Sequence, residues 1–162
     1  MQLQPELIRD VAIFGGLSEE TLAFLIHRAE CVSVKCGEDF LREGEMGTSF
    51  FVLETGAVQV TKVSLAKSIL LCEFGPGAAF GEMSLLAVMP RSATISATED
   101  CTAIEISNRS LFELYEANAH EFAMLIMNLG REVARRLWET NERLFALSAE
   151  RSVSLRRRRD AQ

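Results

Sequence analysis

A glutamate and an arginine stand nine positions apart in a mostly apolar segment of this chain. Glu82 follows Gly81, while Arg91 follows Pro90 and precedes Ser92. A buried carboxylate or guanidinium is costly unless it is paired or binds something. A carboxylate accepts hydrogen bonds from hydroxyls, and a guanidinium donates two parallel bonds to a phosphate. A small ligand with an anionic group and a hydroxyl would therefore satisfy both side chains.

The neighbouring residues fit the same kind of ligand. Gly81 lets a ligand approach the backbone closely because it has no side chain. A short helix predicted after Glu82 leaves N–H groups, that of Ser84 among them, for an anion. Ser92 adds a neutral hydroxyl donor. Such a site would hold one phosphate and one ribose edge, although a structural salt bridge between the two charges is the alternative.

Length and composition are those of one ordinary domain with an appendage. The chain has 162 residues, of which 48% are hydrophobic and 25% charged, enough for a real core. We expect no secretory signal, since the N-terminus lacks a basic-then-apolar run. The best apolar stretch, 122–129, is too short to span a bilayer. These features predict a cytoplasmic protein.

The predicted secondary structure changes from helical to β along the first two thirds of the chain, and the two charges lie in the β part. Residues 1–28 indicate an N-terminal helical segment, with a helix from about Leu7 to Phe14 and a second capped by Ser18. Residues 29–106 predict a β-roll in which the segment 80–94 contains a short helix, Glu82 to Ala87. Short β-prone runs separated by turns indicate an antiparallel barrel or jelly roll. They are 31–35, 39–42, 49–54, 57–64, 68–74, 92–98 and 102–106.

After this roll the chain is predicted to be helical, so the fold class is α+β. Residues 107–150 contain a short helix and then a long one, from about Ala119 to Ser148, with an apolar stripe at three- and four-residue steps. Part of the stripe would cover the barrel, and the rest leaves open a homodimer seam. Residues 151–162 are predicted to be a disordered basic tail.

Charge is distributed unevenly along the chain. The net charge is −6, but residues 156–162 carry +3, which leaves −9 on the first 155 residues. An acidic body argues against a folded nucleic-acid binder. The four-arginine run is most often a solvated tail, and contact with an anionic membrane or nucleic acid is the alternative.

No catalytic or metal-binding set is found. The four cysteines have no CxxC spacing, so we expect buried free thiols and no zinc. His27 and His120 are expected on helix surfaces. There is no Ser-His-Asp order and no P-loop, so the sequence predicts a protein without enzymatic activity, metal or cofactor.

The run Phe80-Gly81-Glu82, followed by Pro90-Arg91-Ser92-Ala93-Thr94, closely resembles the phosphate-binding cassette of cyclic-nucleotide-binding domains. That family includes the catabolite activator protein, the regulatory subunits of cAMP-dependent protein kinase and cyclic-nucleotide-gated channels. Further similarity lies in Phe14-x-x-Leu17 and in the turn Glu43-Gly44-Glu45-x-Gly47. The resemblance extends over roughly residues 7 to 148.

The resemblance implies a role for each site residue. Arg91 would bind the exocyclic phosphate and Glu82 the ribose 2′-hydroxyl. Backbone groups around the cassette would complete the cradle, at Gly81, Met83, Ser84, Ser92 and Ala93. On the long helix, Thr140 and Asn141 would be candidate purine contacts or, equally, ordinary solvated positions. Ser92 favours cAMP over cGMP.

Three functions follow as alternatives. The first is a regulatory module that binds cAMP or cGMP and signals to an effector protein by movement of its C-terminal helix. The second is a structural or dimerising adaptor with a vestigial pocket. The third is the sensor part of a longer transcription regulator or channel, although few residues follow the long helix.

Overall fold

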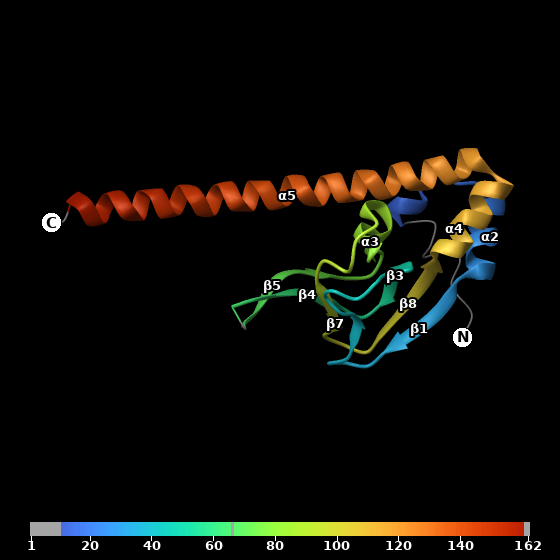
Figure 1. Cartoon of the computed structure of the whole chain (residues 1–162), viewed down its shortest axis with the longest axis horizontal. Helices are drawn as coiled ribbons and strands as arrows, with labels where there is room; N and C mark the ends of the chain where they lie inside the picture. Colours follow the sequence, from blue (N-terminus) through green and yellow to red (C-terminus); the bar gives the residue numbers. More distant parts are fainter. Residues whose placement is uncertain (1–10, 66, 161–162) are drawn as a thin grey trace. The chain divides into compact units, whose positions relative to one another are not determined.

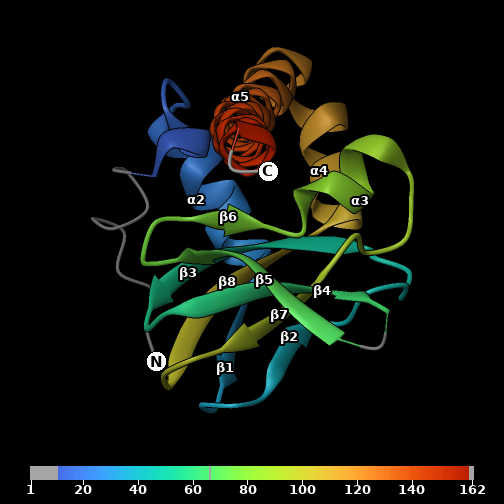
Figure 2. The ribbon, with the colours of Figure 1, turned by 90° about the vertical axis from the view of Figure 1, so that its left-hand side faces the viewer.

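The computed structural model describes residues 11–65 and 67–160, with side chains described up to residue 149. It divides into two units, Met1–Leu129 and Gly130–Gln162, and each is described by itself. The first unit contains two four-stranded antiparallel sheets (Figures 1 and 2). One sheet has the order β1-β8-β3-β6, with bounds Glu30–Val34, Cys101–Ser107, Ser49–Thr55 and Ala79–Phe80. The other has the order β2-β7-β4-β5, with bounds Asp39–Leu41, Thr94–Ala97, Val58–Ser64 and Lys67–Phe74.

This arrangement confirms the predicted jelly roll, with small shifts in the strand ends. Seven of its strands correspond to the seven predicted runs. The eighth, β6, was missed because it has only two residues, Ala79 and Phe80, paired with Val52 and Phe51. So short a strand has no alternation to detect.

Strand β3 lies between two hydrophobic cores. Phe50 and Val52 pack toward the helices, while Phe51 and Leu53 face the core between the sheets. Successive side chains of a strand point to opposite faces, so a strand covered on both faces reads as an unbroken apolar run. The same alternation divides β8 between the two cores.

The helices of the first unit begin at serine caps. In α2, Glu19–Arg28, the N–H of Thr21 donates to Ser18 Oγ at 3.2 Å, as predicted. In α4, Asn108–Ala117, the corresponding cap is Ser107. The helix expected from Leu7 lies partly outside the described residues. Within them it is the 3-10 helix η1, Ala12–Phe14.

The long helix α5, Ala119–Asp160, changes character along its length. Up to residue 129 it belongs to the first unit, where Leu125 and Leu129 are fully buried. Asn128 is also buried there, and its side-chain amide donates to Ile13 O at 3.0 Å and Gly15 O at 2.8 Å. The helix runs past the predicted end, Ser148, and includes residues 151–160, expected to be disordered. The side chains of the arginine run lie outside the described residues.

The histidines lie where we expected them, but not all of the cysteines do. His27 and His120 are exposed on helices, as predicted. The cysteines are free thiols, but the expectation that they are buried is wrong for Cys31 and Cys36, which are exposed, and holds for Cys101. Cys31 lies within the edge strand β1 and Cys36 just beyond its end, where solvent reaches them. In the described part of the chain, no helix has the length and apolarity needed to cross a membrane.

Candidate functional site

The cassette begins where β6 meets a six-residue helix. Gly81 follows β6 with φ +84° and is the N-cap of α3, Glu82–Ala87, the helix that the sequence predicted. A left-handed φ favours glycine, so the backbone turns sharply at this position. A Cβ on Gly81 would also lie 2.7 Å from Arg91 Nη1. The missing side chain of Gly81, which we expected to leave space for a ligand, therefore leaves space for the guanidinium of Arg91.

Arg91 is buried although it carries a charge. Its residue is 7% exposed, and its Nη1 donates to Gly81 O at 2.7 Å and to Ser84 Oγ at 2.8 Å. Among the residues that the structure describes, no carboxylate forms an ion pair with it. A salt bridge to Glu82 is therefore not what holds the guanidinium. Two neutral oxygens hold it, both from the other half of the cassette.

Electrostatics around Arg91 reflect this burial. Burial lowers the pKa of the guanidinium from its ordinary value, and the carboxylates of Glu105, Glu82 and Glu45 oppose that shift from a distance. A guanidinium remains protonated in proteins. The site therefore keeps a desolvated positive charge that an anion would stabilise.

Gly47 makes room for the guanidinium, a role that the sequence analysis missed. A Cβ at Gly47 would lie 2.5 Å from Arg91 Cζ, Arg91 Nε and Ser84 Oγ. Its φ does not lie in the left-handed region, so space and not backbone conformation requires glycine here. In the sequence, a glycine in the segment 43–47 predicts a turn. It does not predict that the turn lies against Arg91.

The other cassette residues differ in how deeply they are buried. Glu82 is 3% exposed and Ser84 6%, and Ser84 Oγ donates to Gly81 O at 3.0 Å while it accepts from Arg91. Ser92 is exposed, with Oγ 3.7 Å from the sulfur of the exposed Met83. Ala93 is half-buried against the core between the sheets. The two halves of the predicted cassette therefore meet, with the charges inside and Ser92 at the surface.

The two helix candidates lie in the second unit. Thr140 is exposed and its hydroxyl donates to Arg136 O at 2.7 Å, a bond within α5. Asn141 is also exposed. Their part in the site stays a prediction.

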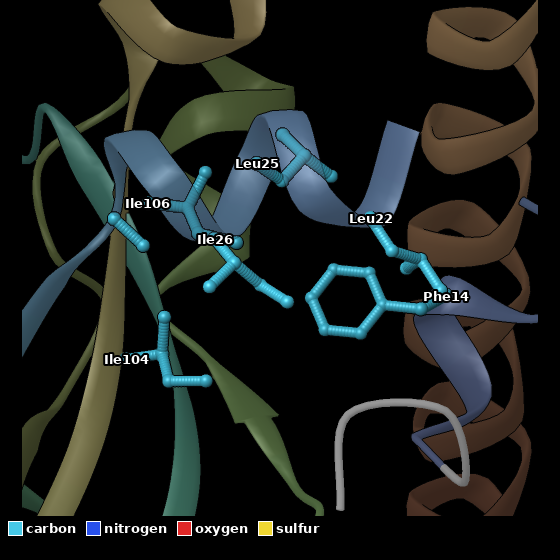
Figure 3. A pocket seen from close by; sticks show the side chains of 7 residues that line it. Phe14, Leu22, Leu25, Ile26, Ile104 and Ile106 are labelled. Carbon is cyan, nitrogen blue, oxygen red and sulfur yellow. The ribbon is translucent and has the colours of Figure 1, made fainter. Parts of the chain in front are cut away.

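A small apolar cavity lies elsewhere in the first unit. Its volume is about 10 Å³, and it is lined by side chains of η1, α2 and β8, with Ala29. Figure 3 shows Phe14 and Ile26 turned toward the side of Ile104 and Ile106, with Leu22 beside Phe14. That volume is at the lower limit for a single water, and no polar side chain lines it. It is a packing gap, not a nucleotide site.

Comparison with known proteins decides the family. A model of the family described as "Cyclic nucleotide-binding domain" matches residues 31–118. The chain belongs to the cyclic nucleotide-binding domain family. The match covers β1 to α4 and includes the whole cassette.

Relatives of this family are similar over much of the chain. The "cAMP-dependent protein kinase regulatory subunit" of Yarrowia lipolytica is 33% identical over 55% of this chain and 23% of the relative. The "Cyclic AMP receptor protein" of Thermus thermophilus is 30% identical over 85% of this chain and 62% of the relative. The chain thus spans less than two thirds of these relatives.

Solved structures agree with the fold. A cyclic nucleotide-binding domain from Methylobacillus flagellatus superimposes with a TM-score of 0.78 and 25% identity, over 87% of this chain and 80% of that one. The regulatory domain of Toxoplasma gondii PKA, crystallised with cAMP, has a TM-score of 0.64 and 25% identity, over 67% of this chain and 42% of that one.

Proposed function

We propose that this chain is a non-catalytic regulatory module that binds a cyclic nucleotide, favours cAMP over cGMP, and signals through its C-terminal helix. The observation that carries the proposal is Arg91. It is buried, and hydrogen bonds to neutral oxygens, not a carboxylate, hold it. A desolvated guanidinium of this kind gains most from an anionic ligand.

In this proposal the two charges bind different parts of the nucleotide. Arg91 binds the exocyclic phosphate, and the carboxylate of Glu82 accepts from the ribose 2′-hydroxyl. Ser84 contributes its N–H, because its hydroxyl is bonded to Arg91 and Gly81. Further backbone groups complete the cradle, at Gly81, Met83, Ser92 and Ala93.

The preference for cAMP rests on Ser92, since the resemblance to the family associates threonine at this position with cGMP binders. Within the described residues, the hydroxyl of Ser92 donates to the sulfur of Met83 at 3.7 Å, and sulfur is a weak acceptor, so the hydroxyl can turn toward a ligand at little cost. Relatives named for cAMP and relatives named for cGMP both match this chain, so their names favour neither nucleotide. Thr140 and Asn141 are the proposed purine contacts.

Signalling follows if the helix binds the nucleotide in one position better than in another. A ligand then shifts the populations of the two positions by its difference in affinity. We propose that the module lies in the cytoplasm and acts on an effector protein.

The test is calorimetric titration of the full chain with cAMP and with cGMP. We expect tighter binding of cAMP, and a loss of two to four orders of magnitude in Arg91→Ala, since two charge-assisted bonds contribute about 3–6 kcal/mol. Arg109→Ala is the matched control, because Arg109 is an exposed arginine paired with Glu113. Undiminished cAMP binding in Arg91→Ala would overturn the proposal.

One observation favours a second candidate, a dimerising adaptor. Large apolar side chains are exposed on α5 beyond Gly130, at Leu137, Trp138, Leu144, Phe145 and Leu147. Such a surface suits a second copy of the chain. Light scattering that shows a dimer, together with no thermal shift by either nucleotide, would favour the adaptor, because a ligand of the folded state raises apparent stability.

A further inference from the structure

The backbone of Arg91 is fixed by the turn before β3. The N–H of Arg91 donates to Glu45 O at 2.8 Å, and the N–H of Gly44 donates to Arg91 O at 2.9 Å. Both backbone groups of the arginine are therefore used by one turn. This turn also supplies Gly47, against which the guanidinium packs.

The next residue, Ser92, is held by a lysine from the middle of β4. Lys62 Nζ donates to Ser92 O at 2.6 Å and pairs with Glu43 Oε1 at 2.8 Å. The other oxygen of Glu43 accepts from the N–H of Val63 at 3.0 Å. Glu43 is thus fixed to β4 at two points, and Lys62 joins it to the cassette.

Glu43 also reaches the residue that opens β7. Its N–H donates to Thr94 Oγ1 at 3.1 Å. The strands β4 and β7 pair directly, with Thr61 opposite Thr94, and lie side by side in Figure 2. Lys62 and Glu43 therefore close a ring of bonds around Ser92 and Ala93.

Holding the Ser92 carbonyl has a directional consequence. The peptide unit is planar and trans, so the C=O of Ser92 and the N–H of Ala93 point in opposite directions. An ammonium that fixes the oxygen therefore also aims the N–H. It polarises the same peptide, and hydrogen bonds in a chain strengthen one another in this way.

We infer that Lys62, oriented by Glu43, is a positioning residue that aims the Ser92–Ala93 peptide at the anionic group of the ligand. This inference rests on the proposed cyclic-nucleotide site. The Lys62 side chain is 50% exposed and that of Glu43 27%. A pair open to solvent to this extent contributes little to stability, so its effect on binding can be separated from an effect on folding.

The experiment compares cAMP with adenosine, which lacks the phosphate, in calorimetric titrations of the full chain at 0.5 M salt. High salt screens the long-range attraction of surface charges. We expect Lys62→Met to weaken cAMP binding about three- to tenfold, the effect of losing one hydrogen bond, with adenosine binding and the melting temperature unchanged. Lys62→Arg restores the charge and the donor, and should recover most of the affinity.

The matched control is Lys67→Met, an exposed lysine at the start of β5 with no ion pair in the described part of the chain. It should leave both affinities unchanged. Glu43→Gln should weaken cAMP binding in the same direction as Lys62→Met, by a smaller factor. If wild type binds cAMP and Lys62→Met binds it equally well, or loses affinity for both ligands alike, the inference is wrong. If wild type binds no cyclic nucleotide, the proposed function fails instead.

Discussion

Two arginines of this protein, Arg91 in the cassette and Arg135 on α5, are held in opposite ways. Arg135 is 55% exposed and donates to Glu132 at 2.7 and 3.1 Å, and also to Glu139. Its pKa is raised, first by the bond to Glu132. Arg91 is buried, donates to neutral oxygens, and has a lowered pKa because burial removes it from water.

The two arginines differ in how much each would gain from a further anion. Arg135 is already paired, so a further anion would have to displace a carboxylate. Arg91 has lost water without gaining a carboxylate partner among the residues that the structure describes. Space for it comes from two glycines, at 47 and 81, where any Cβ would collide with the guanidinium.

The largest expected effect is on the buried arginine itself. Arg91→Lys keeps the charge but loses the planar pair of donors. We expect cAMP affinity to fall by about a factor of 100, the value of roughly 3 kcal/mol, in calorimetry. Arg135→Lys should bind as wild type does. Equal losses in the two variants would break the comparison.

The next effect tests the space that glycine leaves. Gly47→Ala puts a Cβ 2.5 Å from Arg91 Cζ, so the guanidinium must move. We expect at least a tenfold loss of cAMP affinity, and destabilisation by about 1–3 kcal/mol as in other overpacked sites, measured by urea unfolding.

Its control is a glycine with open space around it. A Cβ on Gly130, in α5, meets nothing within 4 Å. Gly130→Ala should stabilise the protein by about 0.5–1 kcal/mol, because glycine inside a helix costs that much relative to alanine. A stabilised Gly47→Ala variant would show that the cradle is looser than we conclude.

Two asparagines of α5 sharpen the contrast between its buried and exposed parts. Asn128→Ala removes bonds to Ile13 O and Gly15 O and should cost about 1–3 kcal/mol, since the buried carbonyl of Ile13 and the partly buried carbonyl of Gly15 lose a donor. Asn141 is exposed, so Asn141→Ala should change the free energy of unfolding by less than about 0.5 kcal/mol. Similar unfolding midpoints for the two variants would contradict the conclusion that Asn128 is buried and Asn141 is exposed.

The smallest effect is a pH dependence on α5. The bond from Arg135 is the main cause of the lowered pKa of Glu132. A carboxylate with a lowered folded-state pKa adds stability above its unfolded value of about 4.3, and loses it as the pH falls through the folded value. Unfolding measured from pH 6 to pH 3 should show less loss in Glu132→Gln than in wild type. Parallel curves would exclude this contribution.

Much of the fold could be predicted from local patterns. Turn glycines and alternating runs gave the β-roll, and the Glu82–Ala87 helix was confirmed with its bounds unchanged. The strand β6 was missed because two residues carry no period. Exposure of Cys31 and Cys36 was missed because composition does not say which strand lies at an edge.

The site was predicted in part. The motif predicted Glu82 and Arg91 as site residues, which stays a prediction, and the family was confirmed. Gly47, Lys62 and Glu43 were not assigned to the site, because each reaches it through a contact between distant segments. Their residue types alone fit ordinary turns and surface positions.

The central question is whether the buried guanidinium of Arg91 binds the phosphate of the nucleotide. We would titrate wild type and Arg91→Ala with cAMP and with adenosine, in one buffer, by calorimetry. We expect wild type to prefer cAMP by at least about 100-fold, as roughly 3 kcal/mol requires, and the variant to bind both ligands with similar, weak affinity. If the variant keeps the preference of wild type for cAMP, Arg91 does not bind the phosphate and the account is contradicted.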